Sequence, residues 1–333
     1  MKQAGASREL PVFVVVPPNV LLLDIAGPIE VLRRANLEQD AIRFTVAYVG
    51  PATKVGSSIG LTVAGLAPLP ERLPDGAMVM LAGDTAAPLP SGFDSSDAAA
   101  QTQAIVDWLK RVVRPSISVA SICSGALLAA RAGLLDGRVC TTHHLSIPAL
   151  KALAPLAQVE ENRLFVVDGD RLSSAGVTAG VDLMLHLVAK LAGPAVAVSA
   201  ARYLVVYMRR GGDDPQLSPW LEARNHIHPA IHRLQDAIAA EPARAWSVAA
   251  AARVAATSPR NLSRLFNQHA GMSVTTYVNH MRVARARQLV TGSRLDMETV
   301  AERAGFQSPR QLRRAWGRIY DQPPSRARAG PAT

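Results

Sequence analysis

The sequence contains few cysteines and no long uninterrupted apolar segment. Cys123 and Cys140 are the two cysteines in 333 residues, too few for a disulfide framework. The apolar run of residues 10–23 is broken by two prolines and an asparagine at residues 17–19, so it predicts no membrane-spanning helix. The first residues also lack the charged region and cleavage site of a signal peptide. We therefore expect a cytoplasmic protein that does not act at a membrane.

Lysine is absent from residues 221–333, yet this segment is strongly basic. It contains 17 arginines and seven acidic residues, whereas the rest of the chain contains 19 basic and 19 acidic residues. The net charge of +10 therefore belongs entirely to the last third. Guanidinium groups form paired hydrogen bonds with phosphates and guanine edges, so this segment predicts double-stranded DNA as the partner. An acidic membrane surface would require a long basic amphipathic face, which the sequence lacks.

The first two hundred residues alternate between strand-like and helix-like segments. Strands are expected at residues 10–16, 43–49, 77–81, 117–120, 159–167 and 171–174, and helices at residues 26–34, 99–113, after Cys123 and 177–191. This alternation predicts an α/β domain, a mostly parallel sheet with helices on both faces. Ligands of such sheets bind beyond the carboxyl ends of the strands, and Cys123 follows one of these ends.

Cys123 lies where a predicted strand turns sharply into a helix, and Gly125 leaves room for the turn. Such a turn projects its residue into a crevice, and the partial positive charge of the helix N-terminus favours a thiolate. A nucleophile is therefore one interpretation of Cys123. A small buried apolar side chain is the alternative, and the local sequence does not decide between them.

Several motifs occur together in this part of the chain. They are DIAGPIEVLRRAN from residue 24, LAGD from residue 81, SICSGALLAARAGLLDGR from residue 121, TTHH from residue 141 and SSAGVTAGVDLMLHLV from residue 173. In this order they resemble the ThiJ/PfpI branch of the class I glutamine amidotransferase-like superfamily, over about residues 8–193. The resemblance implies a site built around the cysteine, with Asp24 as the acidic residue on the first loop that points at it.

The sequence departs from the enzymes of that superfamily directly after the cysteine. Amidotransferases and proteases of the group place a histidine there, and this chain has Ser124. Acyl transfer needs a base as well as a nucleophile and an oxyanion hole, so we expect no enzyme. The vestigial or pocket candidates are Cys123, Asp24, Ser124 and His143. We expect a small-molecule pocket, without metal or cofactor, lined by Asp24, Gly83, Asp84, Cys123, Ser124, His143 and His144. The alternative is an active cysteine-dependent hydratase or hydrolase that resembles the isonitrile hydratases of this superfamily.

A segment of turn-forming residues separates the two halves of the chain. RRGGDDPQLSPW, from residue 209, contains two glycines, two prolines and adjacent aspartates, which interrupt helices and strands. We therefore predict an amidotransferase-like domain at 8–208, a linker at 209–224 and a DNA-binding domain at 225–328.

The C-terminal domain contains an internal repeat. SPRNLSRLF begins at residue 258 and SPRQLRRAW begins fifty residues later, each with serine as N-cap and proline at the first helical position. Short helices are expected before them, at residues 248–254 and 297–303, and one continuous helix at residues 274–289 joins the copies. Gly305 suits the turn of the second unit, whereas Ala256 stands in the turn of the first.

Two helix-turn-helix units joined by a helix resemble the AraC/XylS family of transcription regulators. The similarity spans about residues 225–328 and includes GFQSPRQLRRAWGRIYDQPPSRAR. It implies a set of base-facing side chains that lie opposite the apolar stripe in the first turns of each recognition helix: Arg260, Asn261, Ser263, Arg264, Arg310, Gln311, Arg313 and Arg314.

The two resemblances together are those of the GlxA-type regulators. They imply a sequence-specific DNA-binding regulator whose N-terminal domain senses a small, nitrogen-containing metabolite. They also imply a homodimer through the N-terminal domain, with RNA polymerase as a candidate partner.

Overall fold

The computed structural model describes residues 8–89, 96–176, 178–206, 212, 216, 228–320 and 322–328. The chain divides into two compact units, Met1–Gln216 and Leu217–Thr333. Of the segment expected to be a linker, only Gly212 and Gln216 are among the described residues.

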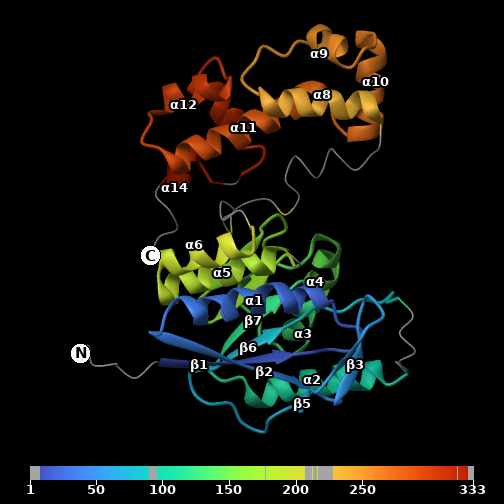
Figure 1. Ribbon diagram of the computed structural model, residues 1–333. Coiled ribbons are helices and arrows are strands. Elements are labelled where there is room, and N and C mark those ends of the chain that lie inside the picture. Colours follow the sequence, from blue (N-terminus) through green and yellow to red (C-terminus); the bar gives the residue numbers. More distant parts are fainter. Residues whose placement is uncertain are drawn as a thin grey trace, which may run out of the picture. The chain divides into compact units, whose positions relative to one another are not determined.

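A seven-stranded sheet forms the centre of the first unit (Figure 1). The strand order is β10-β11-β7-β6-β1-β2-β5, and every neighbouring pair is parallel except the antiparallel pair β10–β11. The strands are β1 (Arg8–Val15), β2 (Ile42–Gly50), β5 (Ala67–Pro68), β6 (Met78–Leu81), β7 (Ser118–Ile122), β10 (Phe165–Asp168) and β11 (Arg171–Ser174). Two further ladders pair β3 (Lys54–Gly56) with β4 (Thr62–Ala64) and β8 (Val139–Cys140) with β9 (Gln158–Val159).

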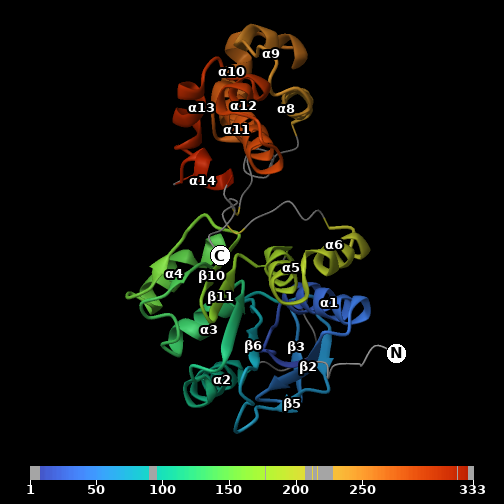
Figure 2. The ribbon, with the colours of Figure 1, turned by 90° about the vertical axis from the view of Figure 1, so that its left-hand side faces the viewer.

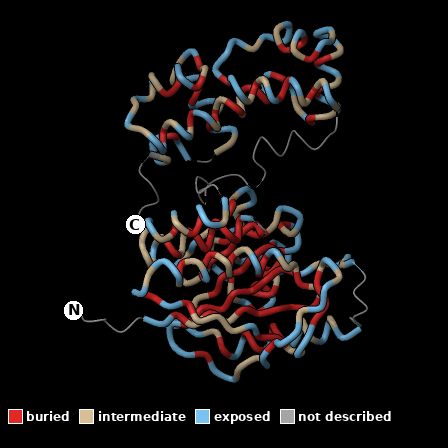
Figure 3. Tube along the Cα trace, in the orientation of Figure 1, coloured by how far each residue is buried: buried red, intermediate tan, exposed pale blue. Residues whose placement is uncertain are grey.

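Helices cover both faces of this sheet because successive strand residues point to opposite sides (Figure 2). In β6, Met78 and Met80 pack with one apolar cluster, and Val79 and Leu81 with another. The first cluster includes α1 (Leu22–Glu38), α5 (Thr178–Ala192) and α6 (Pro194–Tyr203). The second includes α2 (Ala98–Val112), α3 (Gly125–Arg131) and α4 (Ile147–Leu153). Buried residues accordingly line the strands and the inner helix surfaces (Figure 3), and the predicted α/β fold is confirmed.

Two expectations about this unit were wrong. The strand expected at residues 159–167 is two strands, since a turn at residues 161–162 separates β9 from β10, and each pairs with a different neighbour. The first helix begins at Leu22 rather than near Ala26, so Asp24 lies in its first turn and not on a loop. Its N-terminal turn encloses Asp24, whose carboxylate is buried.

The second unit is helical throughout its described secondary structure. Its helices are α8 (Pro229–Ala240), α9 (Val248–Val254), α10 (Pro259–Ala270), α11 (Val274–Gly292), α12 (Met297–Ala304), α13 (Pro309–Trp316) and α14 (Pro324–Arg328). Ser258 and Ser308 cap α10 and α13, each accepting a hydrogen bond from the backbone N–H three residues ahead. The two predicted helix-turn-helix pairs, α9–α10 and α12–α13, are therefore present.

Helix α11 joins the two pairs and packs against each with a different face. Val274, Val278 and Met281 belong to the apolar cluster of the first pair, whereas Val283 and Val290 belong to that of the second. Met281 is the last α11 residue in the first cluster, and Val283 is the first in the second. These two residues are two positions apart, which corresponds to about 200° around a helix of 3.6 residues per turn. One continuous helix thus packs against the two helix-turn-helix pairs with nearly opposite faces.

The two helix-turn-helix turns use the same left-handed conformation with different residues. Gly305 has a φ of 92°, and Ala256 has a φ of 51°. In both turns the next residue donates a hydrogen bond back to the last turn of the helix, Phe306 to the Ala301 carbonyl and Thr257 to that of Ala252. The alanine therefore does not abolish the first turn, but it occupies a conformation that favours glycine.

Candidate functional site

Cys123 lies at a sharp turn between β7 and α3, as the sequence predicted. Its φ of 56° is in the left-handed region, where a non-glycine residue costs about 1–2 kcal/mol. Gly125 allows the turn because a side chain there would lie 2.3 Å from the Leu81 carbonyl oxygen. The strained residue is held by a hydrogen bond from its N–H to the Ser174 carbonyl. Backbone strain of this kind is concentrated at functional sites.

Five of the predicted pocket residues meet at this turn. The Gly83 N–H donates to Asp24 Oδ2 at 3.2 Å, and the Asp84 N–H donates to Ser124 Oγ at 2.9 Å. The Ser124 hydroxyl lies 3.0 Å from Asp84 Oδ1. Gly83 must be glycine because an added Cβ would lie 2.6 Å from the Asp24 carboxylate and 3.0 Å from the Cβ of Cys123. Asp24, Gly83, Asp84, Cys123 and Ser124 therefore form one connected cluster.

The Cys123 thiol is held in its protonated form. The side chain is 5% exposed, and Gly176 lies against it, so that a Cβ on Gly176 would be 2.6 Å from the sulfur. Burial raises the pKa of Cys123 to about 12, and the Asp24 and Asp84 charges act in the same direction. A hydrogen bond from the Ser124 N–H lowers this pKa but does not outweigh the other effects. The helix N-terminus therefore acts in the predicted direction, through the Ser124 N–H, but burial beside two carboxylates outweighs it.

The backbone donors that could stabilise an oxyanion already have acceptors. The Gly83, Asp84 and Ser124 N–H groups bind, in that order, the Asp24 carboxylate, the Ser124 hydroxyl and the Cys123 sulfur. An oxyanion hole requires donors aimed at the position where charge develops. Among the described residues of the cluster, these three donors are therefore engaged rather than aimed at such a position.

The two predicted histidines lie in the turn that follows Thr142. His143 precedes the 3-10 helix η1 (His144–Ser146), and its Nδ1 accepts a hydrogen bond from the Leu145 N–H at 3.3 Å. His144 is exposed and stacks on His143 with ring centres 4.2 Å apart. Burial lowers the pKa of His143. Within the described part of the chain, neither histidine is among the groups that shift the pKa of Cys123.

A chain of hydrogen bonds links the cysteine to the end of the first unit. The Thr142 hydroxyl donates to the Cys123 carbonyl at 2.7 Å. The Gln216 carboxamide donates to the Thr142 carbonyl at 2.8 Å, and the Gln216 backbone N–H donates to Asn162 Oδ1 at 3.1 Å. Sequence reasoning missed Thr142, Gly176 and Gln216; the TTHH and SSAG motifs contain the first two, but no local pattern indicates Gln216.

The side chains predicted to face DNA lie on the outer surfaces of α10 and α13. Leu262 and Phe266 are buried on α10, as are Leu312 and Trp316 on α13. The predicted set lies on the other sides and is exposed except for half-buried Asn261: Arg260, Asn261, Ser263, Arg264, Arg310, Gln311, Arg313 and Arg314.

The two recognition helices differ in how their polar side chains are held. On α10, Asn261 donates to the Thr257 hydroxyl at 2.8 Å and accepts from Arg264 at 3.0 Å. On α13, the guanidinium groups of Arg310, Arg313 and Arg314 have no hydrogen-bond or ion-pair partner among the described residues. Among the described residues, α13 thus presents three cations without an ion-pair partner, whereas α10 presents polar side chains that are already hydrogen-bonded to one another.

No helix among the described residues is long and apolar enough to cross a membrane.

Comparisons with known proteins agree with both units. The model of the DJ-1/PfpI family matches residues 11–190, and that of a helix-turn-helix domain matches residues 251–330. The HTH-type transcriptional regulator CdhR of Pseudomonas aeruginosa is 31% identical over 320 residues, which cover 94% of this chain and 89% of CdhR. The HTH-type transcriptional regulator GlxA of Rhizobium meliloti is 30% identical over 311 residues, 93% of each chain. Isonitrile hydratase of Pseudomonas putida is 28% identical over 179 residues, 53% of this chain and 69% of the hydratase. The chain therefore belongs to the family of HTH-type transcriptional regulators that join a DJ-1/PfpI domain to an AraC-type helix-turn-helix domain.

Proposed function

We propose that the α/β unit of this DNA-binding regulator senses a small metabolite at the carboxyl edge of its sheet, around Cys123, without covalent catalysis. The outer surfaces of α10 and α13 read base edges, and the outcome of sensing is altered DNA binding. A nitrogen-containing effector fits this edge because Asp24 and Asp84 place negative charge beside the thiol. Pairing of two chains through the α/β unit and contact with RNA polymerase remain parts of the proposal.

The protonated state of Cys123 carries the proposal against catalysis. A cysteine nucleophile reacts as a thiolate, and a pKa of about 12 leaves about one thiolate in 10⁵ at pH 7. The base that superfamily enzymes place beside the cysteine is replaced by Ser124, whose hydroxyl is engaged with Asp84. Sensing requires none of these catalytic features, because a protonated thiol can contact a ligand.

Thr142 supports a route from the site to the rest of the protein. Its hydroxyl binds the strained Cys123 backbone, and its carbonyl accepts from Gln216, the last residue of the first unit. An effector that shifts the Cys123 turn therefore changes the contacts that hold the chain where it leaves the α/β unit. Such a ligand acts only to the extent that it binds the two arrangements with different affinity.

One experiment separates sensing from catalysis. Purified full-length protein is assayed for turnover of isonitriles, amides and α-dicarbonyl compounds, alongside Cys123→Ala and Asp24→Ala. We expect no turnover, and we expect thermal-shift ligands of the wild type to change operator affinity. A Cys123→Ala protein that still binds the operator but responds differently to ligand would support a sensor.

The alternative is a hydratase or hydrolase, favoured by the left-handed turn at Cys123 and by the buried Asp24 beside it. Turnover by the wild type that disappears in both variants would establish it, because loss of a nucleophile removes orders of magnitude in rate. The reaction would then have to proceed with Ser124 at the position where other enzymes of the superfamily have a histidine.

A further inference from the structure

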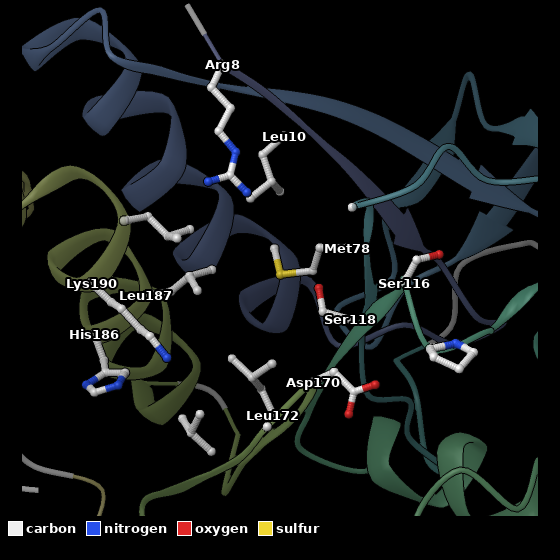
Figure 4. A pocket seen from close by; sticks show the side chains of 15 residues that line it. Arg8, Leu10, Met78, Ser116, Ser118, Asp170, Leu172, His186, Leu187 and Lys190 are labelled. Atoms are coloured by element: carbon white, nitrogen blue, oxygen red, sulfur yellow. The ribbon is translucent and has the colours of Figure 1, made fainter. Parts of the chain in front are cut away.

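A cavity lies at the amino edge of the sheet, opposite the carboxyl edge where Cys123 stands. Figure 4 shows the side chains that line it. Its volume is about 260 Å³, and its walls come from the amino ends of β1, β6, β7 and β11 and from the last turns of α5. Pockets for drug-sized ligands measure roughly 300–1,000 Å³, so this one suits a smaller molecule.

The floor of the cavity is apolar. It is formed by Leu10, Met78 and Leu172, which are buried, together with the half-buried Leu187 and Leu191 of α5. A ligand that reaches this floor gains roughly 25 cal/mol for each Å² of apolar surface that it removes from water. The floor therefore favours a ligand with a hydrocarbon or aromatic body.

Two cations line the cavity, one from a helix and one from a strand. Lys190 extends its ammonium toward the interior from α5, and Arg8 extends its guanidinium over Leu10 from the start of β1 (Figure 4). Neither side chain has a hydrogen-bond or ion-pair partner among the described residues. The two charges therefore remain available to an anion at the rim.

The acidic residue of the cavity does not neutralise these cations. Asp170 is paired with Arg138 at 3.0 Å and with Arg171 at 2.9 Å, so its charge is already balanced. His186 also lines the cavity, and burial together with the Lys190 charge lowers its pKa, which leaves it neutral near pH 7. Ser116 and Ser118 add hydroxyl groups at the rim.

We infer that this cavity binds a small amphipathic carboxylate, with its apolar body on the leucine and methionine floor and its carboxylate between Lys190 and Arg8. Inorganic phosphate would use the cations without the floor, and a neutral alcohol would use the floor without the cations. The site is independent of Cys123 and of the effector proposed there. Helix α5 connects the two regions, because Gly180 in its first turns packs on Ile122 next to Cys123.

The test is calorimetric titration of full-length protein with two acids, hexanoate and benzoate. The matched alcohols hexanol and benzyl alcohol probe the apolar floor alone, and inorganic phosphate probes the cations alone. We expect saturable binding of both acids, at least about tenfold tighter than of the matched alcohols or of phosphate, because only the acids use both the floor and the cations. Lys190→Glu and Arg8→Glu should each weaken acid binding at least tenfold. Lys110→Glu is the matched control, since Lys110 is an exposed lysine in the last turn of α2.

Three outcomes would overturn the inference. The first is the absence of saturable acid binding, and the second is acid binding that Lys190→Glu and Arg8→Glu leave unchanged. The second would mean that Lys190 only complements the α5 dipole, in which case its reversal lowers thermal stability alone. The third is acid binding that is lost in Cys123→Ser but kept in Lys190→Glu, which would assign the acid to the other edge of the sheet.

Discussion

The Gln216 carboxamide donates a hydrogen bond to the Thr142 carbonyl oxygen at 2.8 Å, across 74 residues of sequence. The same NH₂ group lies 3.2 Å from the Glu161 carbonyl oxygen and 3.2 Å from the Thr141 hydroxyl. One amide thus fastens the end of the α/β unit to the loop that also binds the Cys123 backbone.

Gln216→Glu should release this attachment, because a carboxylate oxygen replaces the donor and would face the carbonyl oxygens of Thr142 and Glu161. We expect operator affinity without effector to change about fivefold or more, which corresponds to roughly 1 kcal/mol of coupling. Fluorescence anisotropy with labelled operator measures this affinity. Gln158→Glu, on exposed β9, is the matched control. Unchanged affinity and unchanged ligand response in Gln216→Glu would remove Thr142 from the proposed route.

Cys123 should react slowly with alkylating agents at neutral pH. A pKa of about 12 lowers the thiolate fraction roughly 10³-fold relative to a thiol of pKa 9.0, and burial restricts access further. Iodoacetamide labelling followed by mass spectrometry should show a rate that keeps rising between pH 9 and 12. Asp24→Asn should raise the rate, since it removes a charge that disfavours the thiolate. Rapid labelling at pH 7.5 would contradict the protonated site.

The same pKa makes folding sensitive to alkaline pH. The folded state keeps the Cys123 proton between pH 9 and about 12, where the unfolded chain releases it. The stabilising contribution is therefore complete below pH 9 and is lost as pH rises toward 12. Urea unfolding of the wild type and of Cys123→Ala at pH 8 and pH 10.5 measures how much unfolding free energy each protein loses between these two pH values. The wild type should lose more stability than the variant, and equal losses would show that the thiol pKa is not raised.

The turns of the helix-turn-helix units should respond oppositely to exchange of alanine and glycine. Ala256→Gly should stabilise the C-terminal unit by about 1 kcal/mol, because it relieves a left-handed alanine. Gly305→Ala should destabilise it by more than that, since its φ is 92° and the new Cβ would lie 2.5 Å from the Ala243 Cα. Calorimetry of the full-length variants gives both values. A lower unfolding temperature for Ala256→Gly would disprove the strain.

How far the sequence predicts this molecule depends on how local each feature is. The repeated Ser-Pro-Arg starts of α10 and α13 predict their caps and apolar faces, because capping and periodicity involve neighbouring residues. The turn at Cys123 was predictable for the same reason. The thiol pKa was not, because it depends on contacts with Asp24 and Gly176, which are distant in the chain. No local sequence pattern indicates Gln216, because its hydrogen bond to the Thr142 carbonyl joins residues that only folding brings together.

Arginines on the recognition helices should contribute to DNA affinity in two distinguishable ways. Replacement of a base-facing arginine, such as Arg310→Ala, should cost about 1–3 kcal/mol and relax the preference at one base position. Replacement of an arginine that contacts phosphate should weaken binding to all sequences and reduce the salt slope by about 0.9. Titrations of operator and unrelated duplex at several salt concentrations separate the two. Arg202→Ala, on α6 of the α/β unit, is the control. If every variant on α10 and α13 behaves like Arg202→Ala, these helices do not read DNA.

Helix α11 should fix the spacing of the operator. Its 19 residues extend about 28 Å, close to the roughly 34 Å of one DNA turn, and it holds the two helix-turn-helix units through separate apolar clusters. Arg282 strengthens the connection, because its guanidinium donates to the Pro242 and Arg244 carbonyls while lying beside Gly305.

We therefore expect two half-elements about 10 base pairs apart on one face of the duplex. Inserting 5 base pairs between them should abolish high-affinity binding, because the second recognition helix would then face the wrong side of the DNA. Ala284→Pro interrupts α11 at the start of the second cluster, directly after Val283, and should reduce this dependence on spacing, at a cost of about 3 kcal/mol in helix stability. Ala284→Ser tests the same position without breaking the helix. If the wild-type protein still binds and protects both half-elements after the 5-base-pair insertion, α11 does not hold the two units in register.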